Sequence, residues 1–190
     1  MFLALPLAEA LRAELQRFQT ELAAKLPPGS VRWNRPGQIH LTLKFLGAVR
    51  AAEIPQLTDA VRGACANAAA MRLKAVKFDC FPNAASPRVL WIGVNGDVAA
   101  LARLQQRLTA ATEAFGDHRE RENFSPHLTL GRVQARRPRE IRALGCALAG
   151  VTFGEQGEWW ADTVELAQSV LHPSGAIYHT LAQVPLHRAG

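Results

Sequence analysis

The sequence has few cysteines and no long hydrophobic run, and both absences exclude classes of protein. Its three cysteines, Cys65, Cys80 and Cys146, are widely spaced and form no C-x-x-C pair, so neither a disulfide framework nor a zinc site is indicated. No segment reaches the roughly eighteen apolar residues that cross a bilayer, and no basic region precedes the apolar residues 1–7 as it would in a signal peptide. We therefore expect a cytoplasmic protein with no membrane partner.

Size and composition indicate a globular protein with a sizeable core. The 190 residues are 48% hydrophobic, which fits one large domain or two closely packed halves. Stretches rich in Pro and Gly are only turn-sized, so we expect one bilobal domain over residues 1–190, acting as a monomer. The net charge of +6 is compatible with an anionic partner such as nucleic acid, although many basic proteins carry such an excess on solvated faces.

One tetrapeptide, His-Leu-Thr-Leu, occurs twice, at residues 40–43 and 127–130. Each copy lies in a short apolar run, residues 38–47 and 125–133, with Gly or Pro at the flanks, and this pattern predicts a strand. The other expected strands are 2–5, 72–81, 88–94, 151–153, 163–171 and 177–184, and the expected helices are 8–26, 52–70, 98–115 and 138–148. Strands and helices alternate in the same order around each copy, which indicates two halves built on a similar plan.

Strand geometry predicts how the two copies could form a site. Side chains two residues apart share a face, so His40 and Thr42 point one way, and His127 and Thr129 do the same in the second copy. Imidazole exchanges a proton near neutrality, and a facing pair can act as acid and base together. Threonine hydroxyls on the same face can donate to an anionic oxygen. The pattern therefore predicts a cleft suited to in-line attack at phosphorus without a metal or a protein nucleophile.

The paired motifs and their surroundings resemble the 2H phosphoesterase superfamily, in particular its bacterial RNA 2',3'-cyclic phosphodiesterase branch, once called 2'-5' RNA ligases. The resemblance spans nearly the whole chain. It rests on Arg35-Pro36 with residues 39–47, on residues 124–132, on Phe81-Pro82 and residues 87–91, and on residues 169–171 and 175–178.

This resemblance implies an α+β fold with two antiparallel sheets in lobes related by a pseudo-twofold axis, outer helices and a central cleft. It also implies hydrolysis of a terminal 2',3'-cyclic phosphate on RNA to a 2'-phosphate without metal or cofactor. Run backward, the same steps would give 2'-5' ligation. We expect His40 to be the acid and His127 the base, and the reverse assignment stays open.

Four further residues are candidates for substrate contact. Lys44 shares strand parity with the first motif and could reach the phosphate, and Arg132 follows the second motif, although both could be solvated surface residues. Phe45 and Trp91 could stack on a terminal base. Trp91 lies in an apolar strand where core packing is the alternative, and Phe45 has the wrong parity, so it needs a bulge to reach the pocket.

Other functions fit parts of the pattern. The substrate could be a small cyclic phosphate, such as a nucleoside or ADP-ribose derivative, or the cleft could bind RNA ends without catalysis. A metal hydrolase is disfavoured because H-E-x-x-H is absent and neither motif has a carboxylate at ligand spacing. The remaining histidines lack a partner at matching spacing and are left out of the site: His118, His172, His179 and His187.

Overall fold

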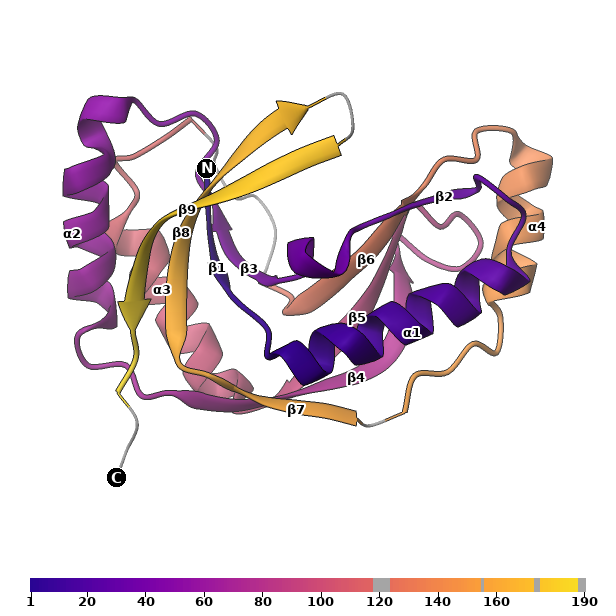
Figure 1. Ribbon diagram of the computed structural model, residues 1–190, viewed down its shortest axis with the longest axis horizontal. Helices are drawn as coiled ribbons and strands as arrows, with labels where there is room; N and C mark the ends of the chain where they lie inside the picture. Colours follow the sequence, from indigo (N-terminus) through magenta and orange to yellow (C-terminus); the bar gives the residue numbers. More distant parts are fainter. Residues whose placement is uncertain (118–123, 155, 173–174, 188–190) are drawn as a thin grey trace.

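The computed structural model describes residues 1–117, 124–154, 156–172 and 175–187, so His118 lies outside the described residues. The elements in chain order are β1 (Phe2–Leu5), α1 (Glu9–Lys25), β2 (Val31–Trp33), the 3-10 turn η1 (Pro36–Gln38), β3 (Leu41–Phe45), the 3-10 turn η2 (Ala51–Glu53), α2 (Ile54–Cys65), β4 (Met71–Phe81), β5 (Val89–Gly96), α3 (Val98–Ala111), β6 (His127–Val133), α4 (Pro138–Leu148), β7 (Gln156–Ala161), β8 (Thr163–His172) and β9 (Gly175–Pro185) (Figure 1).

The strands of the described chain form one antiparallel sheet in the order β7-β4-β5-β6-β3-β1-β8-β9, with β2 beside β6. The β6–β3 junction separates two halves, one made of β7, β4, β5, β6 and β2 and the other of β3, β1, β8 and β9, and the register pair Leu41–Leu128 joins them. The expected α+β class with antiparallel strands and outer helices is confirmed. The two expected sheets, however, are continuous with each other through this junction.

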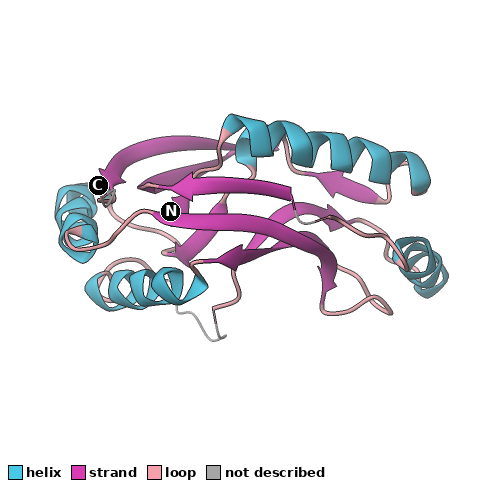
Figure 2. Ribbon diagram, turned by 90° about the horizontal axis from the view of Figure 1, so that it is seen from below, coloured by secondary structure: helices cyan, strands magenta, loops and turns pink. Residues whose placement is uncertain are grey.

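Two helices bridge the two halves of the sheet. α1 runs in the chain from β1 of one half to β2 of the other and packs against β7, and α3 lies between β5 and β6 but contacts β3 as well as β4. The buried face of α1 includes Leu11, Leu15 and Leu22, at the spacing of an amphipathic helix. Figure 2 shows the helices around the outside of the strands. The two halves are therefore held together by helices as well as by the sheet.

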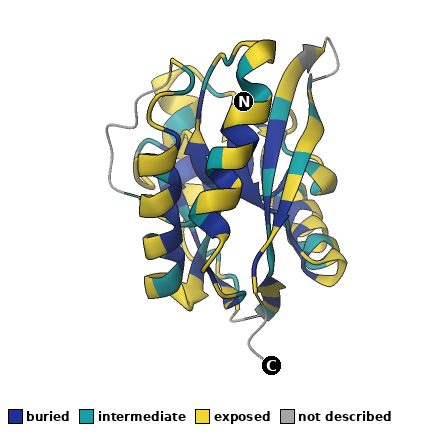
Figure 3. Cartoon of the chain, turned by 90° about the vertical axis from the view of Figure 1, so that its left-hand side faces the viewer, coloured by how far each residue is buried: buried dark blue, intermediate teal, exposed yellow. Residues whose placement is uncertain are grey.

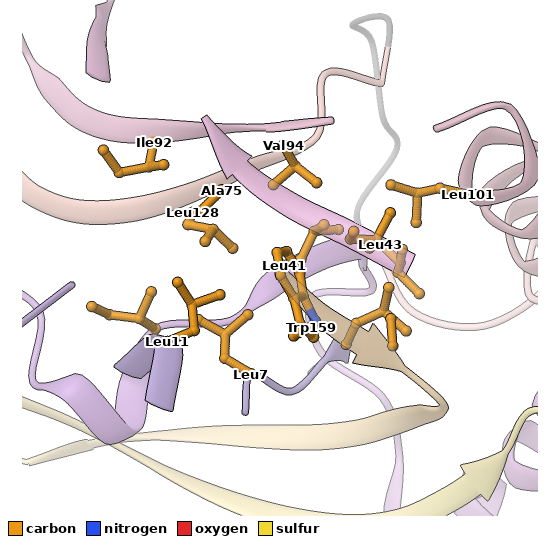
Figure 4. Packing of buried hydrophobic residues seen from close by; sticks show 14 of the residues in the cluster. Leu7, Leu11, Leu41, Leu43, Ala75, Ile92, Val94, Leu101, Leu128 and Trp159 are labelled. Carbon is orange, nitrogen blue, oxygen red and sulfur yellow. The ribbon is translucent and has the colours of Figure 1, made fainter. Parts of the chain in front are cut away.

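The leucines of the two motifs lie in the core. Leu41, Leu128 and Leu130 are fully buried, and Leu43 is 1% exposed. They belong to one cluster of buried residues that includes side chains of both halves and of α1 and α3 (Figure 4). The central strands are accordingly buried while the helices keep an exposed outer side (Figure 3). Because strand faces alternate, burying these leucines turns the histidines and threonines to the opposite face.

Two elements differ from the sequence-based expectation. The strand expected at 151–153 is wrong, since this segment is a loop whose Phe153 packs against Phe18, and β7 starts at Gln156. β2 was not predicted, because three residues are too few to show a period of two. Among the described residues, every helix is too short or too polar to cross a membrane.

Candidate active site

The sheet register interleaves the two motifs. Leu41 pairs with Leu128, and counting one residue in each direction places His40 opposite Thr129 and Thr42 opposite His127. All four of these polar side chains are half-buried. His40, Thr42 and Thr129 line a cleft of about 790 Å³, and His127 lies beside Thr129 on the same strand face. The structure therefore brings the two His/Thr pairs together.

Each imidazole is anchored to the backbone two residues before it. Nδ1 of His127 lies 2.7 Å from the carbonyl oxygen of Ser125, and the His40 ring bonds to the backbone of Gln38. A ring nitrogen that donates to a carbonyl fixes the tautomer and leaves the other nitrogen to exchange a proton. The two histidines are thus prepared for the same chemistry by equivalent local contacts.

Aromatic side chains enclose both rings. His40 stacks on Phe2 at 4.7 Å and meets the edge of Tyr178 at 5.4 Å. His127 meets the edge of Phe81 at 5.2 Å, and the Trp91 ring is 6.0 Å away.

The burial of His40 lowers its pKa from the ordinary value of 6.5 to about 4, because the charged imidazolium loses water, and the hydrogen bond to Gln38 offsets this only in part. His40 is therefore neutral at neutral pH in the substrate-free protein. A neutral imidazole can accept a proton, which bears on the acid and base assignment that the sequence leaves open.

A β-bulge reverses the parity of β3 after Thr42. The register with β1 runs from Leu3 opposite Lys44 to Ala4 opposite Thr42, so Leu43 is the extra residue. Beyond the bulge, Phe45 faces the cleft, which it lines with 48% of its surface exposed. The bulge that Phe45 needs to reach the pocket is present.

The same bulge turns Lys44 away from the cleft. Lys44 is only 4% exposed, and its ammonium donates to the carbonyl oxygens of Thr109 and Thr112, at 3.1 and 3.2 Å, and to the Thr112 hydroxyl at 3.0 Å. These acceptors lie at the carboxyl end of α3, where a cation also offsets the helix dipole. The expectation that Lys44 reaches a bound phosphate is therefore wrong.

Arginines form a basic wall on the β2–β6 side of the cleft. Arg132 lines the cleft, and so does Arg32, its register partner on β2. Arg35 follows on the same side, just before η1. Guanidinium groups bind phosphate oxygens well because their donors match the oxygen geometry. Sequence analysis missed Arg32 because it missed β2.

Trp91 lies on the motif face of the sheet, because its register partner on β6 is Thr129. It is half-buried, stacks on Phe81 at 4.7 Å and lies 6.0 Å from His127, and it is not among the buried residues of the core. Stacking of a terminal base on Trp91 stays a prediction.

The β8–β9 hairpin supplies cleft residues that were not among the expected site residues, although 169–171 and 175–178 belong to the segments that resemble the family. Ser169, His172, Ala176 and Tyr178 all line the cleft. His172 was left out of the site for want of a matching partner, and only the hairpin's position relative to β3 brings it to the rim. In the described part of the chain, no group of three or more His, Cys, Asp or Glu side chains is arranged to hold a metal ion.

Comparison with known proteins identifies relatives of the whole chain. A model of the 2'-5' RNA ligase superfamily matches residues 7–170. A Methanothermobacter thermautotrophicus protein named RNA 2',3'-cyclic phosphodiesterase is 32% identical over 177 residues, covering 93% of each chain, and its Aeropyrum pernix counterpart is 31% identical over 154 residues, covering 80% of this chain and 84% of that one.

Solved structures show the same relationship in the fold. TT0787 of Thermus thermophilus superposes with a TM-score of 0.80 at 29% identity, over 100% of this chain and 98% of that one. Escherichia coli LigT complexed with 3'-AMP has the same fold, with a TM-score of 0.77 at 22% identity over 98% and 97% of the chains. With a family model that matches most of its length and relatives above 30% identity, the chain belongs to the 2'-5' RNA ligase superfamily.

Proposed function

We propose that this protein is an RNA 2',3'-cyclic phosphodiesterase that opens a terminal cyclic phosphate to a 2'-phosphate. The observation that carries the proposal is the interleaving of two His/Thr pairs across the Leu41–Leu128 junction, on the sheet face where His40, Thr42 and Thr129 line a cleft with a basic wall. The names of the relatives that span the chain support the same activity. By the same reasoning, residues 1–190 act as one bilobal domain with one motif in each half.

The chemistry needs one proton acceptor and one proton donor. Water attacks phosphorus in line with the 3'-oxygen, one imidazole takes the water proton, and the other protonates the 3'-oxygen as the P–O3' bond breaks. A new bond joins the water oxygen to phosphorus, so the phosphate remains on the 2'-oxygen. The hydroxyls of Thr42 and Thr129 would donate to the non-bridging oxygens, where negative charge develops.

We assign the base role to His40 and the acid role to His127. Support comes from the apolar surroundings of His40, which keep its imidazole neutral in the substrate-free protein. When a 5'-hydroxyl attacks phosphorus in place of water, the same roles give a 2'-5' phosphodiester and a free 3'-hydroxyl, and the roles exchange only when that linkage is cleaved back to the cyclic phosphate.

The pH dependence of the residual kcat/KM of a His127→Asn variant tests this assignment, because this quantity reports the ionisation of the free enzyme and only His40 of the pair then titrates. If His40 must be neutral, its pKa near 4 leaves kcat/KM insensitive to this group from about pH 5 to pH 7, and the rate falls only as pH drops through 4. If His40 must instead be protonated, kcat/KM would fall about tenfold for each pH unit above 4. A steep decline of kcat/KM from about pH 5 to pH 7 would reverse the assignment.

The walls of the cleft fit the end of a single RNA strand. Arg32 and Arg132 can bind backbone phosphates, and Phe45 offers an exposed ring to a terminal base, which gives little sequence preference. All cleft residues named above come from one chain, which is consistent with a monomer. A cytoplasmic location fits a protein that acts on RNA ends.

The decisive experiment supplies an oligoribonucleotide that ends in a 2',3'-cyclic phosphate, with a chelator present. We expect conversion to the 2'-phosphate, identified by chromatography against 2'- and 3'-phosphate standards. A matched reaction with a cyclic mononucleotide measures how far the RNA chain contributes. Formation of a 3'-phosphate would contradict the proposed leaving group, and turnover of the mononucleotide alone would show that the substrate is a small cyclic phosphate.

A further inference from the structure

Gln38 connects three parts of the cleft. It is the last residue of η1, just before the first motif strand, and it lines the cleft. Its Nε2 donates to the carbonyl oxygen of Ala176 on β9, and its Oε1 accepts the backbone N–H of Arg35 at 3.3 Å. Its own backbone bonds to the ring of His40. One residue therefore links the hairpin, the basic wall and an imidazole.

The hairpin needs such a link because its distal part extends beyond the sheet. β1 pairs with β8 only from Glu165 to Ala167, whereas the β8–β9 ladder continues to the pair of His172 with Gly175. Figure 1 shows the distal part of this ribbon projecting away from the other strands. A two-stranded ribbon is marginally stable by itself, so a contact with the remaining fold contributes strongly to fixing its position.

The same ribbon carries the ring that covers His40. Tyr178 on β9 lies 5.4 Å from His40 and 5.1 Å from Phe2, so three rings pack together where the hairpin meets β1 and β3. If the hairpin moved outward, Tyr178 would leave this cluster and water would reach His40. The contact from Gln38 to Ala176 lies two residues from Tyr178 along β9 and is well placed to prevent that movement.

We propose that Gln38 is a positioning residue that holds the β8–β9 hairpin over the cleft and thereby keeps Tyr178 against His40. For catalysis, this inference rests on the proposed cyclic phosphodiesterase activity, in which the hairpin encloses the terminal nucleotide. Loss of the Gln38 side-chain bonds weakens substrate binding by loosening one wall, while the Gln38 carbonyl still orients His40.

The test compares Gln38→Met, which keeps the side-chain length but removes the hydrogen bonds, with the unaltered protein. We expect KM for the cyclic phosphate RNA to rise about three- to tenfold, the effect of one hydrogen bond, with kcat changed less than about twofold. Gln183→Met is the matched control, because Gln183 bonds to Glu165 within the same hairpin but does not line the cleft. A fall in kcat at unchanged KM would overturn the proposal.

A second readout does not depend on turnover. Titration of the His40 ring by NMR, without substrate, should give a pKa near 4 in the unaltered protein and a value nearer 6.5 in Gln38→Met, because water gains access to the ring. In a Tyr178→Leu background, the Gln38 substitution should add little, since the cover is already lost. The proposed role would be contradicted if the pKa shifts of His40 caused by the Gln38 and Tyr178 substitutions were fully additive. It would also be contradicted if the His40 pKa stayed near 4 in Gln38→Met. Gln38→Asn, whose amide is too short to reach Ala176, provides a second variant for both measurements.

The two proposals fail in different ways. If the unaltered protein opens no cyclic phosphate but the NMR titration shifts as expected, the proposed function is wrong and the positioning role stands. If turnover is normal and the titration does not shift, the positioning role is wrong and the proposed function stands.

Discussion

Substitution of either His40 or His127 by asparagine is expected to lower kcat for a cyclic phosphate substrate by two to four orders of magnitude. Asparagine is similar in size and polar, but it does not exchange a proton near neutrality. Both imidazoles act in the same displacement step, one on the attacking water and one on the leaving oxygen. The double variant should therefore be little slower than the slower of the two single variants. Rates under saturating substrate, in the presence of chelator, provide the measurement.

His179→Asn is the matched control for these variants, since His179 is exposed on β9 and does not belong to the cleft lining. Binding of the 2'-phosphate product, measured by calorimetry, should persist in the His127 variant because the arginines and Phe45 remain. Near-normal turnover in either motif variant would refute the two-histidine mechanism. Loss of product binding together with turnover would instead indicate that the variant is misfolded or that the cleft only recognises its ligand.

Leu41→Ala is expected to lower the free energy of unfolding by about 3–5 kcal/mol, the upper part of the range for truncation of a buried leucine. Leu41 is fully buried and forms the register pair with Leu128 that joins the two halves. Truncation removes apolar contacts and leaves a cavity in a region where strands of both halves meet, so local collapse cannot easily fill it. Urea denaturation followed by circular dichroism measures the change.

Leu181→Ala serves as the control, because Leu181 on β9 is 36% exposed and its truncation should cost much less. If Leu41→Ala unfolded at the same urea concentration as the unaltered protein, the junction between the halves would not be the tightly packed centre described above. A change in the denaturant slope, without a change in midpoint, would point to altered cooperativity between the halves.

Local sequence patterns predicted the His/Thr pairs because they depend only on strand alternation. Leucines and polar residues alternate through both motifs, so the face of His40, Thr42, His127 and Thr129 follows from the burial of their neighbours. The prediction for Lys44 failed because strand alternation is interrupted before this residue. Strict alternation put it on the motif face, and the bulge at Leu43, which depends on pairing with β1, moved it to the opposite one.

The remainder of the site depends on contacts distant in sequence. Arg32 reaches the cleft because β2 pairs with β6, and Tyr178 does so because the β8–β9 hairpin packs beside β1. Neither residue lies in a repeated or periodic pattern that would single it out. Phe45 could be anticipated only on condition that a bulge occurred. Short strands and edge positions are therefore where the sequence was least informative.

The interleaved register has a consequence for the symmetry of the site. Two identical motif strands, paired at this leucine, would carry the same four side chains in the same order, with no distinction between acid and base. In this chain the matching positions five residues after each motif histidine differ, and they are Phe45 and Arg132. The asymmetry beyond the motifs therefore gives the cleft a direction in which a polar, asymmetric polymer can be bound.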